Sequence, residues 1–477
     1  MSVARGTMWG FLFFLIAAGA AANAPAYGSP SPLALQIDRD LTSAMRYYGV
    51  PGAAIMVIRN GHVIYVRAFG VRDLKHRLPV RTNTIFEIGS ITKQFTAACI
   101  LQLQEKGKLR IDRLLSDYLP DAPHAREVTL RQLLTHTSGL HDYLDGPWKE
   151  VARLAARPIA YRDLIARVAR LPLDFAPGTK WSYSNTGYLL LGKVIEKISG
   201  QSYRDYLQNH ILRPLHMIDT HTTANENRLP RMALGYWHID GKLERAPIID
   251  PSWGNSAGFL VSTLGDLAKW DAALRGGKVV SSASYRDMTT PFMTTKNGSA
   301  NYGFGLFVDS VYGQARIGHT GGSQGFTTAD EYFPRQGVRV IAFTNLGDST
   351  PEAGEALTNV LFADLYPAVA AKALTSAPGE NAAIARIVRE AFRELQTGKG
   401  YALFGARLKS KLAGGIGRKF VIAFGPYGAP TGEIFEGTRK DAKDIWYDYT
   451  MQLGPGAMLP FAVKIGRDRT VSSFSIG

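Results

Sequence analysis

A serine and a lysine lie three residues apart in the segment Ser90-Ile91-Thr92-Lys93. The residues that follow have helical spacing as far as Lys106, so a helix begins near Ser90 and both side chains lie on one of its faces. A serine hydroxyl is a weak nucleophile until a base removes its proton, and a lysine can be that base when burial lowers its pKa. Because this four-residue pattern also arises by chance, the pair needs further groups beside it.

A tyrosine motif, Tyr183-Ser184-Asn185, comes after Ala176-Pro177-Gly178 and before a leucine-rich helical segment. This context predicts a loop that leads into a buried helix. The Tyr183 phenol can relay a proton to a leaving group, and the Asn185 amide can orient Lys93 and hydrogen-bond a substrate.

A glycine-rich motif, Gly318-His319-Thr320-Gly321-Gly322, ends a predicted strand. Glycines at this position let a substrate backbone or acyl group lie along the strand edge. The N–H of Gly322, together with that of Ser90, would then form an oxyanion hole. Glycines that merely form a turn are the alternative interpretation.

The three motifs occur in one order, with 93 residues between Ser90 and Tyr183 and 136 between Tyr183 and His319. In this order the chain resembles the serine β-lactamase and penicillin-binding protein superfamily, specifically the class C β-lactamase-related serine hydrolases. The resemblance covers Leu33 to Leu365 and includes three further stretches: Leu133–Leu140, Phe175–Gly178 and Ala257–Thr263.

The resemblance implies a role for each motif residue. Ser90 would be acylated, and Lys93 and Tyr183 would exchange its proton. The substrate would be bound by Asn185, His319, Thr320, Gly321 and Gly322. His319 stands where many β-lactamases have the lysine of a Lys-Thr-Gly triplet, and a mostly neutral histidine attracts a β-lactam carboxylate less than a lysine does.

The expected function is therefore an exported serine hydrolase that forms an acyl-enzyme at Ser90. Its small-molecule or peptide substrate would be an ester or amide, so that the enzyme is an esterase, a D-amino-acid peptidase or carboxypeptidase, or a weak β-lactamase. The alternative is a non-catalytic or slowly deacylating sensor that binds β-lactams or cell wall, with peptidoglycan as partner. From Glu380 onward 15 basic residues stand against 9 acidic ones. An ordinary solvated surface is the default interpretation of this charge, and binding of an anionic wall polymer is the alternative.

His136 and Cys99 could each have a functional role, but their sequence contexts favour a structural one. His136 lies between hydroxyls and precedes a glycine, which is typical of a turn that closes a helix, although a second base is the alternative. Cys99 is the only cysteine, has helical spacing from Phe95 and Leu103, and is expected to be a buried thiol. No metal-ligand spacing, phosphate loop or dinucleotide motif is apparent, so neither metal nor cofactor is expected.

The N-terminus predicts export. Residues 1–26 read as a signal peptide, with Arg5, an apolar run over Trp9–Ala22 and small residues around a cleavage point between Ala22 and Ala26. The run is too short to span a bilayer, and no later stretch qualifies, so the mature protein is expected in the periplasm or outside the cell, without a transmembrane segment. Nucleic acid is an unsuitable partner for an exported chain, despite the net charge of +15.

The periodicity of the chain predicts an α+β fold. A helix over Leu33–Tyr48 precedes two strands, Ala53–Ile58 and Val63–Val66, which an Asn-Gly turn joins as a hairpin. A helical block follows over 111–217, including a buried helix around 189–198, and a capping box at Thr263 opens another helix. Strands return near 302–309, 315–319, 327–333 and 338–345. Strands at both ends of a helical insert predict one antiparallel sheet flanked by helices, with a helical subdomain.

A composition change near the C-terminus predicts a second unit. The hydrolase domain would span 33–365, and the Ala, Pro, Ser and Gly content of 366–381 is typical of a linker. Beyond it, 382–477 would form a small α+β module, with helices near 384–395 and 401–412 and strands at 445–449 and 461–465.

Overall fold

The computed structural model describes residues 31–145, 148–222, 229–239, 242–294, 298–299, 301–347, 352–425, 428–441, 444–466 and 468–476. The predicted signal peptide, 1–26, lies outside these residues. Among the described helices, none combines the length and the apolar character that crossing a bilayer requires.

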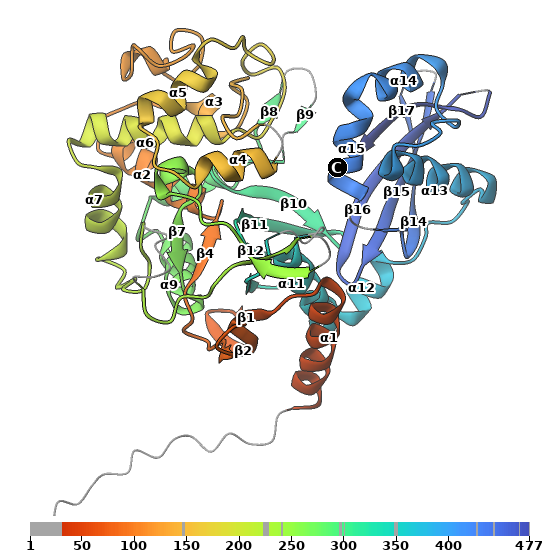
Figure 1. Ribbon diagram of the computed structural model, residues 1–477, viewed down its shortest axis with the longest axis horizontal. Coiled ribbons are helices and arrows are strands. Elements are labelled where there is room, and N and C mark those ends of the chain that lie inside the picture. The colour runs from red at the N-terminus through yellow and green to blue at the C-terminus, as the bar shows by residue number, and fades with distance from the viewer. Residues whose placement is uncertain are drawn as a thin grey trace, which may run out of the picture.

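A seven-stranded antiparallel sheet forms the centre of the fold, in the order β10-β11-β12-β13-β1-β2-β3. Strand β1 (Gly52–Arg59) pairs with β13 (Val338–Thr344), so that Ala53 lies opposite Thr344. Strands from the two ends of this part of the chain are thus neighbours, which confirms the predicted sheet and the α+β class. In Figure 1 the helical block, α3 to α6, and the C-terminal strands, β14 to β17, lie on opposite sides of this sheet.

The remaining elements complete the fold (Figure 1). The other strands of the large sheet are β2 (His62–Asp73), β3 (Leu78–Pro79), β10 (Phe307–Val311), β11 (Gln314–Ser323) and β12 (Phe326–Phe333). The two-stranded pairs are β4 (Phe86–Gly89) with β7 (Leu260–Ser262), β5 (Tyr236–Ile239) with β6 (Lys242–Arg245), and β8 (Met293–Thr294) with β9 (Gly298–Ser299). The helices before the C-terminal part are α1 (Pro32–Tyr48), α2 (Thr92–Glu105), α3 (Leu130–Leu134), α4 (Trp148–Ala155), α5 (Tyr161–Ala169), α6 (Asn185–Ser199), α7 (Tyr203–Leu207), α8 (Asn255–Gly258), α9 (Leu264–Arg275), α10 (Ser282–Met288) and α11 (Ala353–Leu365).

Strand β1 is buried on both faces because its alternate side chains enter two hydrophobic cores. Ala54, Met56 and Ile58 pack in the core that contains α2 and α6, whereas the intervening residues pack in the core that contains α1 and α11. A strand covered by helices on both sides has no polar face, which explains its continuous apolar sequence. Helices therefore cover both faces of the sheet at β1. Strand β11 of the same sheet carries the glycine-rich motif.

Most elements predicted for residues 33–365 are confirmed, including the first helix, the hairpin and the helix that follows Thr263. In the hairpin, Asn60 and Gly61 have φ of 49° and 82°, as a two-residue turn of this type requires. The strand predicted over 302–309 was wrong at its start, because β10 begins at Phe307. The Phe304 N–H donates to the Met288 carbonyl instead of to a strand, so this segment packs onto the end of α10.

The C-terminal residues form a four-stranded antiparallel sheet with its own core. Its strands are β14 (Gly432–Asp441), β15 (Asp444–Gly454), β16 (Ala457–Ile465) and β17 (Val471–Ile476), and its helices are α13 (Ala382–Thr397), α14 (Ala406–Lys411) and α15 (Gly417–Phe424). The predicted linker contains a helix, α12 (Pro367–Ala373), because a proline at the first position and several alanines favour one. The helix predicted from 401 begins only at Ala406, since Tyr401 has a φ of 51°.

The turn between β15 and β16 packs against helices α1 and α11. Tyr48 Oη donates to the Pro455 carbonyl at 2.6 Å, and Asn359 Nδ2 donates to the Gly456 carbonyl at 2.9 Å. Gly456 has a φ of 70°, and a Cβ there would lie 2.2 Å from the Ala356 carbonyl oxygen of α11. Only glycine permits so close an approach, so this turn packs tightly against α11.

Candidate active site

Ser90 lies in the turn between β4 and α2, one helical turn from Lys93. The lysine side chain is 0% exposed, whereas Ser90 is partly exposed. Lys93 Nζ lies 3.1 Å from Ser90 Oγ, 2.8 Å from Asn185 Oδ1 and 2.6 Å from the Ala257 carbonyl oxygen. An accessible hydroxyl thus stands beside a buried amine, as the sequence predicted.

Burial changes the acid–base behaviour of this lysine. It lowers the pKa of Lys93 to about 7, and the nearby Asp142 carboxylate opposes the change. A lysine with such a pKa is partly neutral at physiological pH, so its lone pair can accept a proton. Lys93 therefore has the electrostatics of a general base as well as the position.

Tyr183 lies against the same amine. Lys93 Nζ lies 4.7 Å from the centre of the Tyr183 ring. The phenol oxygen is buried, and none of the described residues forms a hydrogen bond of standard geometry with it. Burial raises the pKa of Tyr183 well above its ordinary value, and the hydrogen-bonding effect of the nearby Ser90 hydroxyl partly offsets this rise. The phenol therefore keeps its proton near neutral pH, which suits a relay and leaves Lys93 as the base.

Asn185, the first residue of α6, connects Lys93 to a buried carboxylate. Its Oδ1 accepts from Lys93, while its backbone N–H and Nδ2 donate to Asp142 Oδ2 at 3.0 and 2.9 Å. These bonds leave one orientation for the amide. Asp142 belongs to none of the three motifs, and its contact with Asn185 was missed, because no local pattern links residues 43 positions apart.

His319 lies in β11 and is held as a neutral imidazole. Its Nδ1 lies 2.5 Å from the Thr320 carbonyl oxygen, which can only accept, so Nδ1 carries the hydrogen and Nε2 accepts from Tyr302 Oη at 2.9 Å. Burial, together with the charge of Lys93, lowers the pKa of His319 to about 3. This position therefore presents no positive charge at neutral pH. Nothing in the sequence around Tyr302 indicated its contact with His319.

His136 packs against the loop that carries Tyr183. It follows α3 with a φ of 57°, and its Nδ1 accepts from the Ser184 N–H at 3.1 Å. Its ring centre lies 4.3 Å from that of Tyr183. Burial and the charges of Lys93 and His319 lower the pKa of His136 well below the ordinary value. A buried neutral ring that packs on Tyr183 favours the structural interpretation over a second base.

The glycines of β11 let the turn that carries Ser90 approach the sheet. A Cβ at Gly321 would lie 2.1 Å from the Ile88 carbonyl oxygen of β4, and one at Gly89 would lie 2.8 Å from the Gly322 nitrogen. The pairing of β10 with β11 ends at Gly318, so the described part of the chain leaves one edge of β11 unpaired beyond it. The Ser90 N–H also has no acceptor among the described residues. Both predicted oxyanion donors thus lie close together beside an open strand edge.

We expect Gly321→Ala to destabilise the protein by about 1–3 kcal/mol, because its methyl group would collide with backbone of β4. Gly322→Ala is the matched control, since its Cβ would meet only the flexible end of Glu352, at 3.4 Å. The control should change the free energy of unfolding by less than about 1 kcal/mol. Urea denaturation of both variants measures the difference, and equal values would disprove the tight approach.

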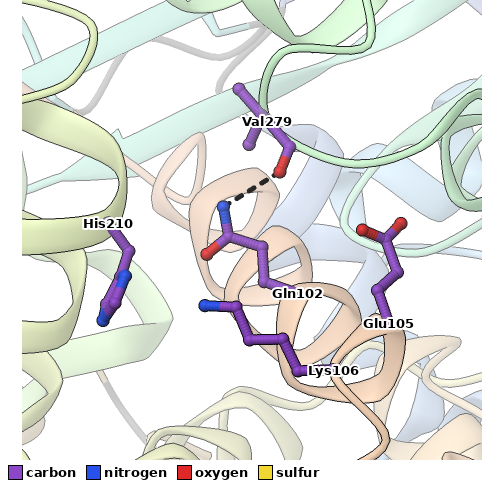
Figure 2. Close-up of a pocket in the computed structure, with 5 residues that line it drawn as sticks. All are labelled: Gln102, Glu105, Lys106, His210 and Val279. Atoms are coloured by element: carbon purple, nitrogen blue, oxygen red, sulfur yellow. Dashed lines mark hydrogen bonds between the residues drawn. The ribbon is translucent and has the colours of Figure 1, made fainter.

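A cavity of about 230 Å³ lies at the other end of α2 (Figure 2). It is lined by Gln102, Glu105, Lys106, His210 and Val279, and Gln102 donates to the Val279 carbonyl at 2.9 Å. A helix of 14 residues is about 21 Å long, so this cavity lies far from Ser90. It is therefore separate from the site of acylation.

The described residues contain no group of three or more histidine, cysteine or acidic side chains arranged to hold a metal ion. Cys99 is buried, and burial raises the pKa of its thiol far above the ordinary value. The thiol is thus unsuited to act as a nucleophile.

The chain belongs to the β-lactamase family, whose model, described as Beta-lactamase, matches residues 37–365. With the serine, lysine and tyrosine assembled as above, it is a serine hydrolase. The putative penicillin-binding protein PbpX of Bacillus subtilis is 32% identical over 312 residues, which cover 65% of this chain and 75% of PbpX.

Two solved structures extend the comparison. A D-stereospecific amidohydrolase from Streptomyces sp. has 27% identity and a TM-score of 0.59, over 69% of this chain and 98% of its own. An octameric penicillin-binding protein homologue from Pyrococcus abyssi has 24% identity and a TM-score of 0.61, over 92% of this chain and 99% of its own. The second match shows only the fold, but it extends beyond the hydrolase part into the C-terminal residues.

Proposed function

We propose that this protein is an exported hydrolase that cleaves amides or esters of D-configured amino acids through an acyl-enzyme at Ser90. The observation that carries the proposal is the buried Lys93, whose amine has a pKa of about 7 and contacts Ser90 Oγ at 3.1 Å. The D-stereospecific amidohydrolase among the similar structures supports the substrate class.

In the acylation step, neutral Lys93 takes the proton of Ser90 Oγ as the oxygen attacks the substrate carbonyl carbon. The resulting oxyanion accepts hydrogen bonds from the N–H groups of Ser90 and Gly322. The Tyr183 phenol gives its proton to the leaving amine or alcohol and regains one from Lys93, so the C–N or C–O bond breaks without a free anion. The products are the acyl ester of Ser90 and the neutral leaving group.

In deacylation the same groups act in reverse. As a water molecule attacks the ester carbonyl, its proton passes to the Tyr183 oxygen while the phenol hands its own proton to neutral Lys93; Lys93 then returns a proton to Ser90 Oγ as the C–O bond breaks. The carboxylic acid product then leaves. Microscopic reversibility requires the group that protonated the first leaving group to deprotonate the incoming water.

The neutral His319 makes a β-lactam a weak substrate. A lysine at this position would attract the β-lactam carboxylate, whereas an imidazole with a pKa of about 3 offers no charge at pH 7. The export part of the proposal rests on the sequence of residues 1–26 alone.

A substrate panel tests the proposal. D-alanine p-nitroanilide, its L-enantiomer, p-nitrophenyl acetate and nitrocefin should be compared by kcat/KM. We expect turnover of the D-anilide and the acetate, with nitrocefin at least about tenfold poorer, since one missing ionic contact is worth about 1.4 kcal/mol or more. Turnover of nitrocefin alone would contradict both the substrate class and the role given to His319.

A further inference from the structure

A second cavity, of about 150 Å³, lies between helix α11 and the β15–β16 hairpin of the C-terminal part. Its polar walls are Glu352, Glu355 and Asn359, and Leu453, Met458 and Leu459 contribute apolar surface from the hairpin. The residues that line it include two carboxyl groups and, among those described, no lysine, arginine or histidine. The cavity is thus acidic on one wall and apolar on the other.

Two oxygens on residues that line this cavity lack donors. Glu352 Oε2 and Asn359 Oδ1 are both buried, and neither accepts a hydrogen bond from a described residue. The Asn359 amide cannot turn to change this without losing the bond from its Nδ2 to the Gly456 carbonyl. A buried acceptor without a donor costs about 1–3 kcal/mol, so a ligand that donates hydrogen bonds is favoured here.

The charges around the cavity favour a cation as that ligand. Arg316 donates to Asp309, Glu331 and Glu355, so three carboxylates share a single guanidinium. Arg316 therefore does not neutralise the charge of the fourth carboxylate, Glu352. Burial raises the pKa of Glu352 to about 7, with Glu355 adding to the rise. A bound cation would favour the ionised carboxylate, which water alone does poorly in a buried cavity.

The cavity also adjoins the strand that receives the substrate. Glu352 Oε1 lies 3.4 Å from the position of a Cβ on Gly322, and the Thr320 hydroxyl is close enough to lower the pKa of Glu352. Gly322 has the Ser90 turn close by, because a Cβ on Gly89 would lie 2.8 Å from its nitrogen. Glu352 therefore lies beside the residue of β11 that the Ser90 turn approaches.

We propose that this cavity is a subsite for a primary ammonium group on the acyl part of the substrate, which Glu352 and Asn359 bind by accepting its hydrogen bonds. The inference rests on the proposed function and narrows it to acyl groups that carry a free amine. The apolar wall from β15 and β16 covers the carbon chain next to the ammonium, so the C-terminal part contributes directly to specificity.

Two pairs of substrates test this subsite. D-alanine p-nitroanilide is compared with its N-acetyl derivative, and Nα-acetyl-D-lysine p-nitroanilide with the Nα-acetyl-D-norleucine compound, which lacks only the side-chain ammonium. We expect the wild type to prefer the ammonium-bearing member of at least one pair by tenfold or more in kcat/KM. Equal values in both pairs would overturn the proposal and would indicate a cavity that holds only water.

Variants from both walls identify the residues responsible. Glu352→Gln should reduce the preference to within about twofold of unity, whereas Glu390→Gln, an exposed glutamate of α13, should leave it intact. Met458→Arg, which brings a guanidinium into the cavity from the hairpin, should abolish the preference as well and provides a second test if Glu352→Gln fails to fold. A preference that survives in both variants would contradict the assignment.

The outcome can be separated from that of the proposed function. Mass spectrometry after brief mixing shows whether each anilide acylates Ser90. If the member of each pair that lacks the ammonium group acylates Ser90 as fast as the member that carries it, the hydrolase stands and the subsite fails. If no anilide or ester acylates Ser90, the proposed function itself is wrong.

Discussion

Ser90→Ala should reduce kcat/KM for every ester and amide substrate by about 10⁴-fold or more and remove all covalent labelling by a fluorophosphonate probe. The substitution deletes the attacking oxygen and little else. Lys93 keeps its bonds to Asn185 Oδ1 and the Ala257 carbonyl, so the pocket should retain its shape. Residual hydrolysis would come from the oxyanion hole and substrate binding alone.

The matched control is Ser182→Ala, which removes an exposed hydroxyl from the loop that carries Tyr183. It should change kcat/KM by less than about threefold, as surface substitutions generally have small effects. Thermal unfolding should show all three proteins with similar midpoints. Equal labelling of wild type and Ser90→Ala would eliminate the acyl-enzyme and with it the mechanism.

Lys93 should give the enzyme a single acidic limb in its pH profile. The neutral amine is the base, so kcat/KM for p-nitrophenyl acetate should rise about tenfold per pH unit below about 7 and level off above it. Burial lowers the pKa of His136 well below its ordinary value and that of His319 to about 3, so neither should contribute to this limb. A neutral acetate is chosen because Glu352, with a pKa of about 7, would also affect a cationic substrate. A flat profile between pH 5 and 9 would contradict the role of Lys93.

Two substitutions at Lys93 distinguish its role as a proton acceptor from its role as a positive charge. Lys93→Met removes both and should lower kcat/KM by about 10²–10⁴-fold. Lys93→Arg keeps the charge, but a guanidinium does not lose its proton in the accessible pH range, so a similar loss is expected. Retained activity in Lys93→Arg would show that the site needs only a cation. Circular dichroism identifies any variant that fails to fold.

The motif residues were the part of the site that local sequence could reveal. Ser90 and Lys93 are three residues apart, and a helix places them on one face whatever surrounds it. The Asn-Gly hairpin and the Thr263 helix start were predictable for the same reason, because turns and caps depend on a few adjacent residues. His136 was interpreted correctly as a helix-closing residue from its neighbours alone.

Long-range contacts were the part that local sequence could not reveal. Asp142 bonds to Asn185 across 43 residues. Tyr302 bonds to His319 across 17 residues and lies in a segment that sequence periodicity had assigned to a strand. Glu352 carries no motif, and only the fold shows that it adjoins Gly322.

The sequence by itself indicated the proposed nucleophile, the proposed base and the order of the three motifs, because each is a short run whose chemistry follows from residue type and spacing. The tertiary structure decided the protonation states and the extent of the site. A pKa near 7 for Lys93, and a neutral His319, both arise from burial. Burial depends on which distant segments pack around a group, and that is a property of the folded chain and not of any local pattern.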